Sequence, residues 1–129
     1  MELLYDAADL TIMHDRTQGW LYITWEGVHA LHAARRCCEE ILMHVQATGS
    51  TKILNDGSQD CDGWSELAGW LANEFFCQLA TSGVVAVAWV TPHNLQAHAT
   101  MNKVLQAVTR PNVLDFKDIE SAYTWLCHA

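Results

Sequence analysis

Basic residues are scarce in this chain. Seven Lys and Arg stand against fifteen Asp and Glu among 129 residues, which gives a formal net charge of −8 at pH 7. Nucleic acids and anionic membranes attract proteins mainly through positive side chains that neutralise phosphate groups. The composition therefore predicts a protein that binds no nucleic acid and no anionic membrane surface.

Long apolar runs are also absent. The longest, Val84 to Val90, is soon followed by Pro92 and His93. A membrane-spanning helix needs about 20 apolar residues, so we expect no membrane insertion. The segment Met1 to Asp6 lacks the basic and apolar regions of a signal peptide, and we expect a cytoplasmic protein.

Paired cysteine motifs are missing as well. The five cysteines are an odd number and none is spaced as Cys-x-x-Cys. Reduced thiols in a cytoplasm are the simplest interpretation. Half of the residues are apolar and 17% are charged, which is enough for one buried core in a chain of this length. We expect residues 1–129 to form a single domain.

Strand-like and helix-like segments alternate along the chain and predict an α/β fold. Strands over Leu10–His14 and Trp20–Glu26 flank a polar loop and predict an antiparallel hairpin, with Leu3–Tyr5 either extending the first strand or preceding it. Apolar residues spaced by three and four predict a helix over Val28–Thr48. The later predicted elements are a strand over Lys52–Asn55, a helix after Asp62, a strand over Val84–Val90, a helix from Asn94, an edge strand over Asn112–Lys117 and a helix capped by Asp118.

The segment Val84–Val90 indicates how the sheet is built. Its apolar residues do not alternate with polar ones, which is typical of a central strand buried on both faces. A hairpin followed by alternating helices and strands, in the order ββαβαβαβα, predicts a mixed sheet covered by helices. Right-handed crossovers are expected in its parallel part.

Several stretches of the chain resemble the STAS family, the sulfate transporter and anti-sigma factor antagonist domains. The resemblance covers nearly the whole chain and is strongest to small bacterial proteins similar to stage II sporulation protein AA. The matching stretches are Trp20–Gly27, Ile53–Asp56, Trp70–Phe76, Gly83–Thr91 and Phe116–Leu126.

The resemblance implies a non-enzymatic domain that docks to protein partners or, in some members, binds a small ligand. In the sporulation antagonists a serine within Asp-Ser-Ser-Gly, at the start of the helix after the central strand, is the phosphorylation switch. The corresponding stretch here, Asn55–Ser65, lacks that motif but contains Ser58 and Ser65. Three aspartates in the same stretch oppose an added phosphate by like-charge repulsion.

Polar residues follow several of the predicted strands. Ligands of open α/β sheets gather at the carboxyl ends of parallel strands, so these residues are interpreted as a polar crevice for a ligand or for a loop of a partner. The alternative is that they are ordinary turn and cap residues. The crevice residues are Glu26, Asp56, Ser58, His93 and Asn94, and the loop expected to contact a protein adds Asp62, Trp64 and Ser65 as candidate binding residues.

Catalytic and metal sites are weakly indicated. Ser58, His93 and Asp56 have the side chains of a nucleophile, a base and an orienting acid, but no G-x-S-x-G elbow accompanies the serine. His29 and His32 have helical spacing, but no third metal ligand follows at a recognisable distance. We predict no catalytic residue, no metal and no cofactor.

Six tryptophans are many for one domain. Trp70 and Trp125 fall outside the apolar stripes of their helices, which indicates either a wider buried face or an anchor for a partner such as a second copy of the chain. The favoured hypothesis is a cytoplasmic, non-catalytic STAS-like module that binds a protein around Asp56–Ser65. The alternative is a protein that holds a small apolar ligand between its helices and its sheet.

Overall fold

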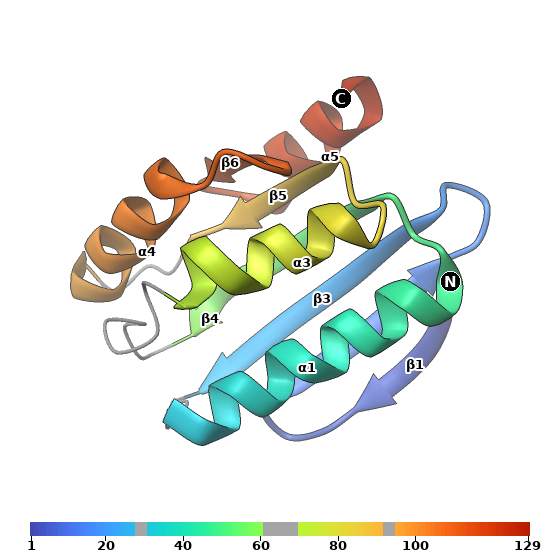
Figure 1. Ribbon diagram of the computed structural model, residues 1–129, viewed down its shortest axis with the longest axis horizontal. Coiled ribbons are helices and arrows are strands. Elements are labelled where there is room, and N and C mark those ends of the chain that lie inside the picture. Colours follow the sequence, from blue (N-terminus) through green and yellow to red (C-terminus); the bar gives the residue numbers. More distant parts are fainter. Residues whose placement is uncertain (28–30, 61–69, 92–94) are drawn as a thin grey trace.

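The computed structural model describes residues 1–27, 31–60, 70–91 and 95–129 (Figure 1). Its strands are β1 (Glu2–Asp6), β2 (Leu10–Asp15), β3 (Trp20–Gly27), β4 (Lys52–Asp60), β5 (Ala86–Val90) and β6 (Asn112–Phe116). Its helices are α1 (Leu31–Thr48), the π-helix η1 (Leu71–Phe75), α3 (Phe76–Thr81), α4 (Leu95–Ala107) and α5 (Ile119–His128). The predicted α/β class is confirmed.

The strands form one mixed sheet in the order β1-β2-β3-β4-β5-β6. The first three strands pair antiparallel, and β3 to β6 pair parallel. The predicted hairpin is therefore present as β2 and β3. The segment Leu3–Tyr5 precedes the hairpin as part of β1, which pairs with β2 and adds a third antiparallel strand.

Strand β5 lies between β4 and β6, and all five of its residues are buried. This confirms the prediction of an inner strand from its unbroken apolar sequence. Val85, just before β5, is exposed, so the strand begins two residues later than the apolar run. Strand β6 lies at the edge of the sheet, as its alternating sequence predicts.

The two faces of the sheet have separate apolar cores. On the face that we call the major face, α1, η1, α3 and α4 pack against residues such as Leu21, Ile53 and Val87. On the opposite, minor face, α5 packs against Leu54 and its neighbours on β5. Figure 1 shows α1, α3 and α4 on one side of the sheet and α5 on the other.

Strand β4 is longer than predicted. The sequence Asn55–Ser58 is rich in turn-forming residues and was expected to end the strand, but β4 continues to Asp60. Its backbone pairs with β3 as far as Gly27 and with β5 as far as Val90. Hydrogen bonding to two neighbouring strands outweighs local turn preference, so the prediction that this strand ends at Asn55 was wrong.

The predicted starts of α5 and α1 can be compared with the structure. Asp118 caps α5 as expected, because its carboxylate accepts the backbone N–H of Ser121 at 2.7 Å. Helix α1 is described from Leu31, so its predicted start at Val28 lies outside the described residues. In the described ranges no helix combines the length and the apolar character needed to cross a bilayer.

Candidate functional site

The carboxyl ends of the parallel strands bring three of the predicted binding residues to one edge of the sheet. Strand β3 places Thr24 opposite Asp56 and Glu26 opposite Gln59. The side chain of Glu26 is exposed, whereas Asp56 and Ser58 are half-buried. Two acidic side chains and a hydroxyl therefore lie on adjacent strands at this edge.

Asp56 holds Ser58 in a local hydrogen-bonded arrangement. One carboxylate oxygen, Oδ1 of Asp56, accepts the backbone N–H of Ser58 at 3.0 Å and its hydroxyl at 2.6 Å. A phosphate on this hydroxyl would replace a short hydrogen bond by repulsion between two negative groups. The arrangement is suited to presenting a carboxylate and opposes phosphorylation of Ser58.

The other predicted binding residues cannot be placed with respect to this edge. Asp62, Trp64, Ser65, His93 and Asn94 all lie outside the described residues. The structure thus places Glu26, Asp56 and Ser58 on adjacent strands at one edge, and a binding role remains a prediction for all eight residues.

A buried asparagine next to this edge is a feature that the sequence analysis missed. Asn55 on β4 lies opposite Trp89 on β5, and its Oδ1 accepts the indole N–H of Trp25 on β3 at 2.8 Å. Asn55 is 2% exposed, and both tryptophans are buried in the major-face core. We name Trp25, Asn55 and Trp89 the Trp-Asn-Trp row.

One polar atom of this row has no partner. Within the part of the chain that the structure describes, Nδ2 of Asn55 is buried and makes no hydrogen bond. From the sequence, Asn55 was expected to be the last residue of a short strand, next to a loop. Its place two residues after the apolar Ile53, in a strand with alternating faces, is the signal that points to the interior.

Gly57 permits the close packing of this row. A Cβ atom at Gly57 would lie 3.0 Å from Nε1 of Trp89 and 3.0 Å from the carbonyl oxygen of Val90. These distances are too short for comfortable carbon contacts, and the carbonyl belongs to an inner strand. The missing side chain therefore lets the indole of Trp89 approach the backbone of β4.

Aromatic side chains of η1 and α3 continue from the row towards the surface. The ring of Phe76 lies 5.8 Å from that of Trp89, Phe75 lies 5.4 Å from Phe76, and Trp70 stacks on Phe75 at 5.9 Å. The guanidinium of Arg35 lies 5.0 Å above the ring of Trp70. Phe75 ends a π-helical turn, a rare conformation that is frequent at functional sites.

Both off-stripe tryptophans have ring contacts within the chain. Trp70 contacts Phe75, and Trp125 lies 5.6 Å from Phe116 in the minor-face core. Each is half-buried. A wider buried face, the first of the two interpretations of these residues, is thus sufficient to explain their positions.

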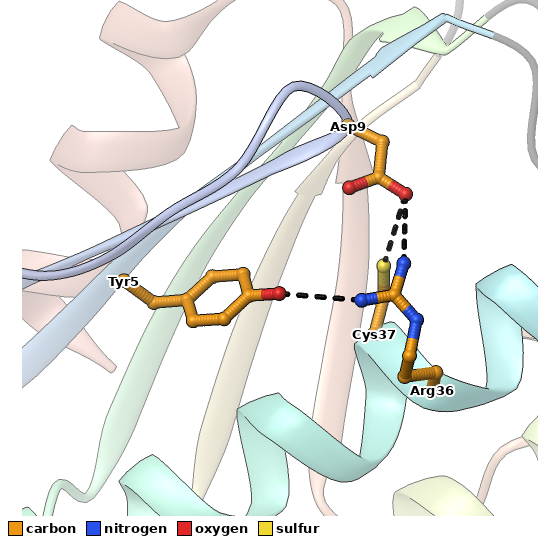
Figure 2. A network of polar contacts seen from close by, with 4 residues as sticks. All are labelled: Tyr5, Asp9, Arg36 and Cys37. Carbon is orange, nitrogen blue, oxygen red and sulfur yellow. Dashed lines mark hydrogen bonds and ion pairs between the residues drawn. The ribbon is translucent and has the colours of Figure 1, made fainter.

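A polar network ties the β1–β2 turn to α1 at the same edge (Figure 2). Arg36 donates to the hydroxyl of Tyr5 and to the carboxylate of Asp9, each at 3.3 Å. The thiol of Cys37 donates to the same carboxylate at 3.7 Å. The backbone N–H of Glu26 in turn donates to the carbonyl of Asp9, which joins this turn to the end of β3.

The thiol in this network is not poised for reaction. Burial is the main cause that raises the pKa of Cys37 to about 12, and the negative charge of Asp9 adds to it. Burial likewise raises the pKa of Cys38. Because the reactive species is the thiolate, both residues serve as core residues and not as nucleophiles. Both side chains are fully buried.

Metal-binding groups are sparse in the described ranges. These ranges contain no cluster of three or more His, Cys, Asp or Glu side chains arranged to hold a metal ion. His32 is exposed on α1, and His29 lies outside the described residues. The described part of the edge combines acidic side chains on β3 and β4 with an aromatic interior.

Comparison with known proteins adds no family name. No family model matches the chain, and no curated protein matches it either. The fold defines the class of protein as an α/β mixed sheet that begins with antiparallel strands.

Proposed function

We propose that this chain is a non-catalytic, STAS-like binding module that regulates a protein partner through direct contacts. The mixed sheet that begins with an antiparallel hairpin and continues through helix-linked parallel strands supports this kinship. So does the carboxyl edge of the sheet, where binding sites of open α/β folds gather.

The observation that carries the proposal is the position of Glu26, Asp56 and Ser58 on two adjacent strands at this edge. Glu26 is exposed, and the net charge of the chain is −8. An acidic rim attracts and orients a partner surface that presents Lys or Arg. A second copy of this chain would bring an equally acidic edge, so edge-to-edge self-association is disfavoured.

The hydrogen bond between Ser58 and Asp56 affects whether Ser58 could be regulated by phosphorylation. The hydroxyl is already a donor to the carboxylate at 2.6 Å, and a phosphate there would meet a negative neighbour. The proposed docking therefore uses the unmodified edge, in contrast to the phosphoserine switch of the sporulation antagonists.

Charge reversal at the edge tests the proposal. The partner is first captured from lysate of the source cell with the full chain and identified by mass spectrometry, and its affinity is then measured by calorimetry with purified proteins. Glu26→Lys should weaken binding at least about tenfold, because it places like charge against the basic surface. Glu39→Lys makes the same charge change on the exposed surface of α1 and should leave the affinity within about twofold.

Two outcomes contradict the proposal. The first is equal affinity of the Glu26→Lys and Glu39→Lys variants for the partner. The second is an affinity that does not fall as salt rises from about 50 to 300 mM. Each would show that the acidic edge is not part of the interface.

A second candidate function is the binding of a small apolar ligand. The unpartnered Nδ2 of Asn55 favours it, because this donor lies among aromatic side chains in the major-face core.

A further inference from the structure

Asn55 has a buried donor for which the chain supplies no acceptor in its described ranges. Its Oδ1 accepts the N–H of Trp25, whereas Nδ2 makes no hydrogen bond. Nine in ten or more buried polar groups in folded proteins are paired, and an unpaired one costs about 1–3 kcal/mol. An acceptor on a bound molecule would remove that cost.

The neighbouring polar side chains restrict what kind of acceptor fits. Trp25 and Trp89 flank Asn55 on the adjacent strands, and an indole can only donate. A buried water needs about two to four partners, including acceptors for its own hydrogens, and these side chains offer few. A carbonyl oxygen has lone pairs and no hydrogen to place. It therefore matches the Nδ2 donor of Asn55 better than a water or an alcohol does.

The surroundings also restrict the rest of the molecule. The major-face cluster that contains the row consists of apolar and aromatic side chains, and burying an ionised group among them would be costly. Phe76 packs on Trp89 at 5.8 Å between ring centres, and Phe75 packs on Phe76. Rings of this kind contact flat apolar molecules favourably, either stacked or edge to face.

We propose that the major-face interior beside Asn55 binds a small, uncharged aromatic carbonyl compound whose oxygen accepts a hydrogen bond from Nδ2 of Asn55. The site lies towards the carboxyl ends of the parallel strands, where such folds place ligands. The proposal rests on the second candidate function, ligand binding, and does not depend on protein docking at the acidic edge.

A pair of probes that differ in one oxygen tests the proposal. Acetophenone and ethylbenzene have the same ring and similar size, but only acetophenone has a carbonyl group. The full chain labelled with ¹⁵N is titrated with each probe and followed by NMR. Acetophenone should bind about tenfold more tightly, the equivalent of one additional hydrogen bond. The side-chain NH₂ resonances of Asn55 should shift with acetophenone and stay in place with ethylbenzene.

Two variants separate the donor from the rest of the row. Asn55→Leu removes Nδ2, and the preference for acetophenone should disappear. Trp25→Phe breaks the same Trp25–Asn55 hydrogen bond but keeps Nδ2, and the preference should persist. The NMR shifts of the unmodified chain remain decisive if Asn55→Leu does not fold.

The outcomes distinguish the proposal from the function on which it rests. If both probes bind equally, or if the Asn55 resonances do not move, the carbonyl proposal is overturned while ligand binding stands. If neither probe binds, and the Asn55 NH₂ group shows only exchange with a bound water, both are overturned.

Discussion

The two faces of the sheet differ in what covers them. The major face is covered by helices that connect successive parallel strands, and it contains the Trp-Asn-Trp row. Among the described helices, α5 alone covers the minor face, where it contacts β4, β5 and β6. Over the antiparallel strands this face shows half-buried residues such as Met13 and Tyr22. The comparison indicates that the major face supplies most of the stability and also contains the polar atom with an unmet hydrogen bond.

Matched leucine truncations should give the largest difference in the free energy of unfolding between the two faces. Leu79 on α3 and Leu126 on α5 are both almost fully buried, on the major and minor faces respectively. Leu79→Ala should lower the free energy of unfolding by about 4 kcal/mol and Leu126→Ala by about 2 kcal/mol, because the thinner layer can relax around the cavity. Urea unfolding measures both values. Equal losses would mean that the two faces contribute alike.

A substitution in the Trp-Asn-Trp region sharpens the comparison. Gly57→Ala should lower the free energy of unfolding by about 1–3 kcal/mol, because the new Cβ would press on Trp89 and on the carbonyl oxygen of Val90. Ser58→Ala, one residue along the strand, removes a hydroxyl from a half-buried site and should cost under about 1 kcal/mol. A neutral Gly57→Ala variant would show that Trp89 and the carbonyl of Val90 can move away from the new Cβ atom.

The smallest expected effect concerns the minor face at low pH. Hydrogen bonds from Ser121 hold the pKa of Asp118 below its ordinary value. The resulting stabilisation is present above the pKa of the unfolded chain, about 3.9, and is lost as pH falls through the lower folded value. Protection of α5 amides against hydrogen exchange should therefore weaken near pH 3, while that of α3 should change less.

A neutral cap serves as the control for this pH dependence. Asp118→Asn keeps a good capping side chain but cannot titrate. Its α5 protection should vary less between pH 7 and about pH 3 than that of the unmodified chain. The same decline in both proteins would assign the acid effect to other carboxylates.

Local sequence patterns were sufficient for much of the fold. The unbroken apolar residues of β5 predict an inner strand, and Asp118 predicts the start of α5, because each signal lies within its own element. The end of β4 was predicted wrongly because Asn55 and its neighbours have strong turn preference. Their strand conformation comes from pairing with β3 and β5, which a local pattern does not contain.

The candidate site was harder to predict for the same reason. Glu26 and Asp56 were assigned to one edge because carboxyl ends of parallel strands meet there. The hydrogen bond between Trp25 and Asn55 joins residues 30 positions apart, and the burial of Cys37 accompanies its contact with Asp9 in a turn 28 positions away. Such pairings depend on strand register and helix placement, which only the three-dimensional structure supplies.

The order of the strands has a consequence for how the chain is made. Each strand pairs with the one before it in the sequence, and no later strand inserts between earlier ones. During synthesis from the N-terminus, every new strand meets a partner that has already left the ribosome. The sheet can therefore form strand by strand during translation. All residues of β5 are apolar, and this strand is covered by β6 and α5 soon after it is synthesised, because both follow it closely in the sequence.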